Sequence, residues 1–415
     1  MVDLLKLLLI LALTIFLLLK KWELGVVLLL NTGLVALLFA YPLAAWGRSV
    51  LGALVAADTL DLAGAVFLVL VLAEVMRRTN AMEQMVTALQ VLVPDGRITV
   101  ALMPLMIGLM PMLGGAMFSA PMVNEVGNPL GLSADRKTFI NYWFRHAMEY
   151  VFPLYSSLLM MAALMGVSVF DFIGASWPLT FAALLGGVIW GLAGIGAPAP
   201  PPESTVGAMA AGTLRPALTV RQAWLTLLRS TWPILLVILT VVVLKLPMVL
   251  SLIGVIALLV AVKRVPPREW WAVLKRSFPP STFLAIVGVM VFKHVMEDAG
   301  AVNSIPQALS TLGLPALLVA FAVPMVVGLL TGTAAAALAL SVPLVAPLLA
   351  GGPLDGLAAG VWLFVGGFSG VLLSPLHLCL ALTREYFGAS WAPIYRRIVP
   401  AVALIVAATV GLVLL

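Results

Sequence analysis

Long apolar segments separated by short polar ones run along the whole chain of 415 residues. The segments 7–19, 234–244 and 402–415 contain no charged residue. Runs of this length and character are typical of helices that cross a lipid bilayer. No polar stretch is long enough to form a sizeable soluble domain. The pattern therefore predicts an all-α, polytopic membrane protein.

The same pattern predicts about ten transmembrane helices and two regions interrupted by Pro and Gly. In the first half we expect spans near 4–19, 24–45, 61–76, 138–165 and 176–195, an amphipathic stretch near 80–94 and an interrupted region near 99–131. In the second half we expect spans near 223–244, 247–262, 281–296, 356–382 and 391–415, an amphipathic stretch near 301–313 and an interrupted region near 316–350. A Pro-rich linker at 196–222, poorly suited to a helix, separates the units 1–195 and 223–415.

Short sequences recur between the two halves. The letters GASW occur at 174–177 and again at 388–391. Five further matches follow the same order at separations of 220 or 222 residues: Val75–Met76 with Val295–Met296, Ala88–Leu89 with Ala308–Leu309, Gly108–Leu109 with Gly328–Leu329, Ser119 with Ser341, and Pro153 with Pro375. We interpret them as a duplicated unit. Shared apolar composition is the alternative explanation.

The interrupted regions indicate re-entrant hairpins, which enter the bilayer and return to the same side. Broken helices survive in lipid only where protein or a cavity covers the freed backbone groups. The first region contains Gly114 and Gly115, and the second has Thr331, Gly332 and Thr333 at its expected tip. The span that follows each hairpin is also expected to be broken. The prolines expected at helix breaks are Pro121, Pro153, Pro343 and Pro375.

With hairpins that return to their own side, each unit crosses the bilayer five times, so the second unit is inverted relative to the first. Equivalent loops then differ in charge: Arg77–Arg78 matches Glu297–Asp298, and the basic loop 263–276 matches a short loop around Arg48. Most of the 23 Lys and Arg residues fall in loops on the linker side. Positive residues favour the cytoplasm, so both termini are predicted to be extracytoplasmic and the linker cytoplasmic.

Inverted repeats with paired broken helices are typical of secondary transporters. Helix ends exposed at mid-bilayer present N–H groups that attract carboxylates, and freed carbonyls can hold Na⁺. The predicted substrate- and ion-binding residues are Gly114, Gly115, Ser119, Asn124, Tyr155, Ser156 and Ser157 in the first unit and Thr331, Gly332, Thr333, Ser341, Ser369, Ser374 and His377 in the second. As an alternative, the hydroxyl groups bond back to their own helices.

Arg145, His146 and Glu149 form a charged cluster within a predicted span, and their spacing places them on one helix face. Ionisable residues at this depth are costly, so a function such as a proton relay is the default hypothesis. Alternatively, Arg145 extends to the headgroups with Glu149 as its structural partner. Lys293 and His294, near an outer end, are expected on a solvated surface.

Composition agrees with this class of protein: 63% of the residues are hydrophobic and only 10% are charged, against about 25% charged in a soluble domain. The single cysteine, Cys379, excludes an internal disulfide and cysteine-rich metal sites. The net charge of +6 comes without a basic, aromatic stripe, so no nucleic acid is expected.

The run SAPMVNEVGNPLGLSADRKTFINYWFRHAMEYVFPLY and the later run GVLLSPLHLCLALTREYFG resemble an uncharacterised family of prokaryotic integral membrane proteins. That family looks like a branch of the ion-transporter superfamily, beside gluconate, C4-dicarboxylate and citrate permeases. The resemblance implies two inverted units, an elevator-type carrier in the cytoplasmic (inner) membrane, organic anions as substrates, and Na⁺ or H⁺ as coupling ion. The Ser-Asn-Thr motif of the dicarboxylate carriers is absent from both hairpins, so no binding residue is carried over from them.

The leading hypothesis is therefore a secondary carrier of a small, carboxylate-type metabolite, acting as a symporter and not as an enzyme. No resident cofactor or metal is expected beyond the coupling ion, and the expected partners are the substrate, the bilayer and a second copy of the chain in a homodimer. Two alternatives remain: an ion channel, or an intramembrane enzyme that uses Arg145, His146 and Glu149. The motif HExxH is absent and the chain has only three His, which argues against a zinc protease.

Overall fold

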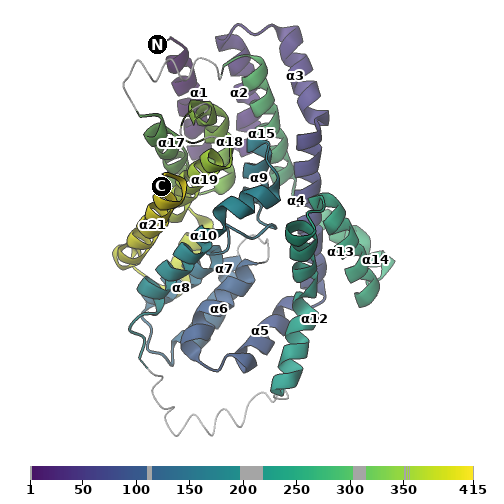
Figure 1. The fold of residues 1–415 in the computed structure, drawn as a ribbon, viewed down its shortest axis with the longest axis vertical. Helices are drawn as coiled ribbons and strands as arrows, with labels where there is room; N and C mark the ends of the chain where they lie inside the picture. Colours follow the sequence, from purple (N-terminus) through teal and green to yellow (C-terminus); the bar gives the residue numbers. More distant parts are fainter. Residues whose placement is uncertain are drawn as a thin grey trace.

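The computed structural model describes residues 2–109, 115–196, 218–301, 315–349, 352, 354 and 356–414. Within these ranges the chain is helical and contains no strand (Figure 1). Six of the described helices are long and apolar enough to cross a membrane, and several shorter apolar helices accompany them. The expectation of an all-α, multi-pass membrane protein is confirmed.

The first half of the chain forms α1 to α10. Their bounds are α1 Val2–Leu19, α2 Leu24–Leu38, α3 Leu43–Val55, α4 Ala57–Arg78, α5 Ala81–Leu92, α6 Gly96–Gly108, α7 Gly115–Gly127, α8 Ala134–His146, α9 Ser156–Met165 and α10 Val169–Gly187, which continues as the π-helical turn η1 Val188–Leu192.

The second half begins with α12 Val220–Ile238, three residues earlier than predicted, because Thr219 and Gln222 form a capping box. The remaining elements are η2 Leu239–Val243, α13 Met248–Lys263, α14 Pro267–Arg276, α15 Pro280–Asp298, α17 Ala316–Thr331, α18 Ala334–Val345, η3 Ala346–Leu349, α19 Gly356–Leu373, α20 Leu378–Phe387 and α21 Trp391–Leu414. The amphipathic stretch expected near 301–313 lies, except for Ala301, outside the described residues.

Two predicted segments need correction. The span expected at 24–45 is two helices, since α2 ends at Leu38 and α3 starts after Pro42, which cannot continue a helix from the preceding turn. The basic loop expected at 263–276 is mostly the helix α14. Pro267 occupies its first turn, Glu269 lies near its N-terminus and Lys275 near its C-terminus, an order that complements the helix dipole.

Both interrupted regions form pairs of packed helices, α6 with α7 and α17 with α18. The second pair turns at Gly332, whose positive φ of 67° suits glycine. Pro121 and Pro343 do not break helices as predicted, because they lie inside α7 and α18. Each proline removes one internal hydrogen bond, which neighbouring protein can compensate in a membrane helix.

The span after each hairpin leaves the helical conformation at its predicted proline. The chain is non-helical between His146 and Ser156, across Pro153, and again between Leu373 and Leu378, across Pro375. The helices that lead into these breaks, α8 and α19, are among the most buried in the described chain.

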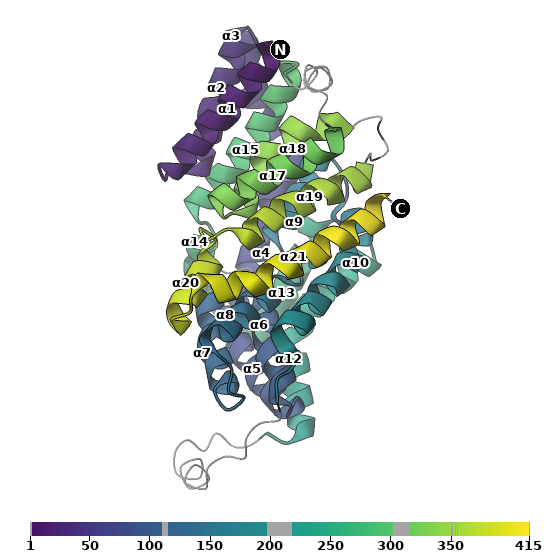
Figure 2. The same cartoon turned by 90° about the vertical axis from the view of Figure 1, so that its left-hand side faces the viewer.

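The helices pack as two groups. One contains the hairpins, the broken helices, α10 and α21, and Figure 2 shows α17, α19 and α21 stacked one below the other. The other group contains α1 to α5 and α12 to α15, with α2 packed on α15 and α4 on α13. The chain is held together as one body by further helix contacts, among them α12 with α5, α4 with α9, and α1 with α17.

Candidate functional site

Two histidines, one from each broken helix, face each other inside the first helix group. His146 is the last residue of α8, and His377 immediately precedes α20. Their Nε2 atoms are 3.1 Å apart. The two imidazoles therefore join the break of the first half to the break of the second half.

The other ring nitrogen of each histidine is already engaged. His146 Nδ1 lies 2.7 Å from the Tyr142 carbonyl oxygen, and His377 Nδ1 lies 2.7 Å from the Gly332 carbonyl oxygen. A carbonyl oxygen only accepts, so each Nδ1 carries a proton and donates it. In the neutral rings both Nε2 atoms then present lone pairs to each other, and the gap between them suits a cation.

An acidic group and an aromatic ring also lie next to the two histidines. Glu149 Oε1 lies 3.8 Å from His146 Nε2, and Ser157 Oγ donates to Glu149 Oε2 at 3.2 Å. The ring of Tyr142, fully buried, lies 4.9 Å from the His146 ring and 5.6 Å from the His377 ring between centroids. His146 and Tyr142 therefore lie in the protein interior, while His377 is partly exposed.

Arg145 points toward the first hairpin. Its Nη1 lies 3.4 Å from the Ile107 carbonyl oxygen, and a side chain on Gly115 would collide with its guanidinium. Only 7% of Arg145 is exposed, so the guanidinium lies at the hairpin tip and does not extend outward as the alternative interpretation supposed. The first turn of α7 thus meets a positive charge beside the histidine pair.

Each hairpin tip is tied to the break that follows it. In the first half, Tyr155 donates from its hydroxyl to the Gly108 carbonyl at 2.6 Å and the Arg145 carbonyl at 3.0 Å. In the second half, Ser374 donates to the Leu329 carbonyl at 2.7 Å, beside the His377–Gly332 bond. Two hairpin tips and two helix breaks therefore meet around His146 and His377.

A family model described as "Protein of unknown function (DUF401)" matches residues 2–194 and 204–415. The chain belongs to the DUF401 family. The gap in the match falls within the Pro-rich linker predicted from the sequence. No curated protein matches the chain significantly.

Several predicted residues of this DUF401 protein satisfy their hydroxyls within their own helix. Ser119 lies 3.4 Å from the Gly115 carbonyl oxygen, Thr331 donates to Val327, and Thr333 caps α18 by accepting from the Ala336 N–H. Among the described residues, the buried hydroxyls of Ser341 and Ser369 have no hydrogen-bond partner.

Three further candidates differ in position. Ser156 is exposed at the first turn of α9. Asn124 accepts from Lys137 Nζ at 2.7 Å near the C-terminal end of α7, the opposite end from the histidine pair. Gly114 lies outside the described residues.

Sequence reasoning missed Cys379 and Tyr142. Cys379 follows His377 by two residues, and its Sγ lies within 4.8 Å of one Nε2 or Nδ1 of both histidines. The spacing His-x-Cys was the available signal, but one cysteine becomes informative only when a distant residue such as His146 lies beside it.

Lys293 is more buried than expected, while His294 stays partly exposed, with 27% of its side chain accessible. They lie 3.3 Å and 3.4 Å from the Asp58 carboxylate, and the Lys293 side chain is only 13% exposed. This ion pair connects α15 with the first turn of α4.

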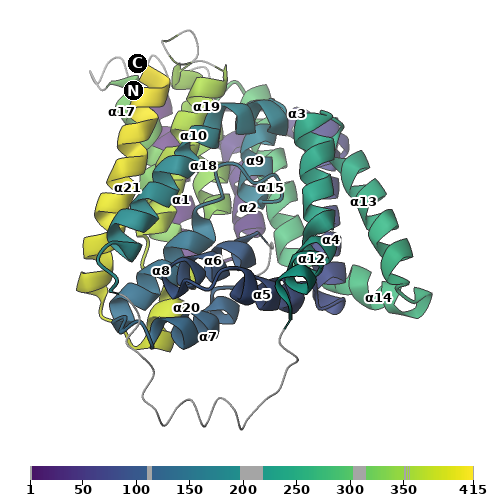
Figure 3. The same cartoon turned by 60° about the horizontal axis from the view of Figure 1, so that its bottom comes forward.

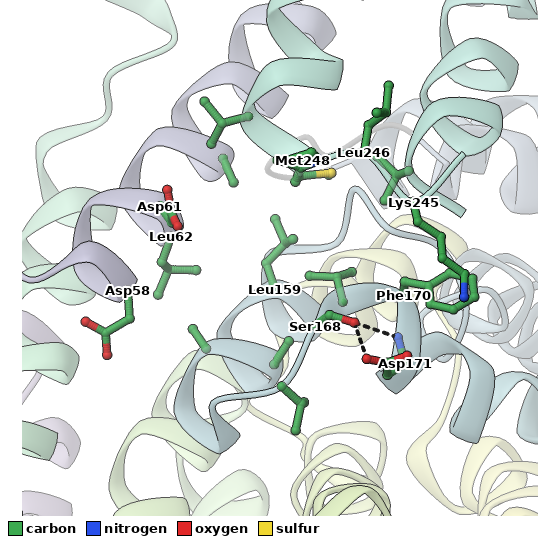
Figure 4. Close-up of a pocket in the computed structure, with 18 of the residues that line it drawn as sticks. Asp58, Asp61, Leu62, Leu159, Ser168, Phe170, Asp171, Lys245, Leu246 and Met248 are labelled. Carbon is green, nitrogen blue, oxygen red and sulfur yellow. Dashed lines mark hydrogen bonds between the residues drawn. The ribbon is translucent and has the colours of Figure 1, made fainter. Parts of the chain in front are cut away.

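A cavity of about 740 Å³ opens at one end of α9, between α4, α10 and α13 (Figure 4). Asp58, Asp61, Asp171 and Lys245 line it, and Leu159 forms part of its α9 wall. Neither His146 nor His377 lines this cavity. It is a separate, mostly apolar chamber, with Leu159, Ala162 and Ala163 of α9 in its wall.

Proposed function

We propose that the protein is a secondary active transporter of a small organic anion of the carboxylate type, coupled to Na⁺ or H⁺. The transport cycle alternates access to a site at the two helix breaks. The observation that carries the proposal is that two hairpin tips and two broken helices meet at His146 and His377. The helix contacts of the first half also have counterparts in the second half.

The packing pairs come in matched sets under the proposed repeat. The contact of α2 with α15 corresponds to that of α13 with α4, and the contact of α7 with α20 corresponds to that of α18 with α9. Within the halves, α6 packs on α8 as α17 packs on α19. Reciprocal pairs of this kind support the proposed duplication over random similarity of apolar helices.

The correspondence extends to single glycines. A side chain on Gly108 would collide with the Arg145 carbonyl, and one on Gly328 would collide with the Gly367 carbonyl. These contacts join equivalent helices at separations of 220 and 222 residues, the separations found in the sequence. Both hairpins therefore pack on their broken helices at the same place.

Equivalent helices run in opposite directions, as an inverted repeat requires. Asp58 at the start of α4 meets Lys293 near the end of α15, while Phe67, further along α4, contacts Phe283 near the start of α15. Likewise Gly186 and Trp190 of the α10 region lie beside Ala401 and Arg397 of α21, respectively. A repeat related by an axis along the membrane normal would make these pairs parallel.

The charge distribution favours an anionic substrate. The N-terminal ends of α7, α9, α18 and α20 lie at Gly115, Ser156, Ala334 and Leu378, next to the tips and breaks. Each helix N-terminus carries partial positive charge, and Arg145 adds a full one. Together they suit a carboxylate, while the freed carbonyls and the histidines suit a coupling cation.

In the view of Figure 3 both chain ends lie at the top and the basic helix α14 lies toward the bottom. Basic segments favour the cytoplasm, so we place α14 in the cytoplasm and both termini outside the cytoplasmic membrane. Labelling of a terminal cysteine by an impermeant reagent on intact cells tests this orientation, and labelling only after lysis contradicts it.

The transport proposal is tested with purified protein in lipid vesicles. A panel of carboxylates, with and without Na⁺, is first screened by melting temperature, since a ligand that binds only the folded state raises it. The stabilising compound should then enter the vesicles by saturable uptake that requires an imposed Na⁺ or proton gradient. Non-saturable conductance would indicate a channel, and a chemically altered substrate would indicate an enzyme.

A further inference from the structure

Three side chains with metal-binding atoms converge at the junction of the two helix breaks. One ligand atom of each of His146, His377 and Cys379 lies within 4.8 Å of those of the other two. His146 is 5% exposed, and His377 and Cys379 are partly buried. Glu149 adds a carboxylate oxygen 3.8 Å from His146 Nε2. The donors of this group are therefore two imidazoles and one thiol.

The hydrogen bonds of the two histidines are those typical of metal-binding histidines. Each donates its Nδ1 proton to a backbone carbonyl, from Tyr142 or Gly332, and this arrangement fixes the ring and aims Nε2 at a metal. Two Nε2 lone pairs at 3.1 Å repel each other unless the two nitrogens share a proton or bind the same metal ion. Tetrahedral zinc, with Zn–N bonds of about 2.0–2.1 Å, sets its ligand nitrogens about 3.3 Å apart.

We infer that His146, His377 and Cys379 bind a divalent transition metal ion of the zinc type. Imidazole and thiolate select such ions over Na⁺, Mg²⁺ and Ca²⁺, which prefer oxygen ligands. Binding forms the metal–sulfur bond as the Cys379 proton leaves to the buffer. The site differs from the sequence-based expectation of no metal, and it does not depend on the transport proposal.

The position of the site means that a bound metal ion would connect two distant parts of the chain. His146 ends α8 in the first half, while His377 and Cys379 flank the start of α20 in the second half. A bound ion would therefore join the two halves at their breaks. Since it binds the folded state, it should raise the melting temperature, and the rise should grow with the logarithm of the ratio of metal concentration to Kd.

Cobalt titration tests the inference directly. The full chain is purified through a tag that lacks histidine, stripped with a chelator and titrated with Co²⁺ in detergent. We expect stoichiometric binding, visible bands of tetrahedral Co²⁺ and a near-ultraviolet thiolate-to-cobalt band, all displaced by Zn²⁺. Failure to bind either ion stoichiometrically would overturn the inference and leave a shared proton between the two Nε2 atoms as the better account.

Variants assign the ligands. Cys379→Ser should remove the thiolate band, and His146→Gln and His377→Gln should each abolish stoichiometric binding, while His294→Gln, the remaining histidine, should leave it unchanged. Size-exclusion profiles and melting curves show whether each variant is folded. Binding that survives in folded His146→Gln and Cys379→Ser proteins would place the metal elsewhere. Because no substrate or vesicle is used, failure of transport leaves this result unaffected, and the reverse also holds.

Discussion

At the scale of single residues, the site depends on side chains that fasten a hairpin tip to a break. His377 and Ser374 bind the carbonyls of Gly332 and Leu329, and Tyr155 binds those of Gly108 and Arg145. The second tip is thus held by two side chains from a single four-residue break, which makes it the most sensitive point of the proposed carrier.

We expect His377→Ala and Ser374→Ala to lower uptake at subsaturating substrate at least about tenfold, equivalent to about 1.4 kcal/mol, because each change releases the second hairpin tip. Lys293→Ala should have a smaller effect, since Lys293 pairs with Asp58 away from the breaks. Initial rates in vesicles, corrected for reconstituted protein, provide the measurement. Equal losses in all three variants would show that the central site is misplaced.

Close helix packing at glycine supplies a stability test. Gly108→Ala and Gly328→Ala place a methyl group against a carbonyl of the neighbouring helix, and such overpacking costs about 1–3 kcal/mol. Gly33→Ala in α2 is the matched control, because nothing lies within 4 Å of its added methyl group. Melting temperatures in detergent should fall for the first two and stay level or rise for the control. A fall of equal size in the control would contradict the close approach.

At the scale of helices, the sequence predicted what local chemistry determines. The interrupted regions and the breaks near Pro153 and Pro375 were predictable, because Pro and Gly disrupt long apolar runs in a recognisable way. Pro121 and Pro343 carry the same local signal yet lie within α7 and α18. Their outcome depends on the packing around each helix, which no local pattern specifies.

The candidate site residues also divide into those that local sequence indicates and those that depend on distant packing. The hairpin and break positions placed Tyr155, Ser374 and His377 near the centre, as the backbone interruptions indicated. The position of Asn124 away from the histidine pair was not predictable locally, because its partner Lys137 lies thirteen residues away across a turn. Cys379 was overlooked because its relation to His146 spans the two halves of the chain.

The opposite direction of equivalent helices can be tested by a disulfide. A Cβ on Gly186 of α10 would lie 3.3 Å from Ala401 Cβ of α21, close to the about 3.5–4.5 Å of a disulfide. In a Cys379→Ser background, Gly186→Cys with Ala401→Cys should form an intramolecular disulfide on mild oxidation. Gly174→Cys with Ala401→Cys, from the other end of α10, should not. The reverse outcome would mean that α10 and α21 run parallel.

At the scale of the whole molecule, the proposed function rests on two halves with reciprocal packing. The pairs α2 with α15 and α13 with α4 build one helix group, and the hairpins, broken helices, α10 and α21 build the other. The connections between the groups include α4 with α9 and α15 with α18. Movement of one group against the other would expose the breaks alternately to the two sides, as elevator-type carriers do.

Counterflow tests this account most directly, because it requires a site that is exposed to the two sides in turn. Vesicles that contain the protein and are loaded with the unlabelled stabilising carboxylate should transiently accumulate the labelled compound from outside, without any imposed gradient. His377→Ala vesicles should accumulate far less. Equilibration of the label without accumulation would identify a channel and contradict the account.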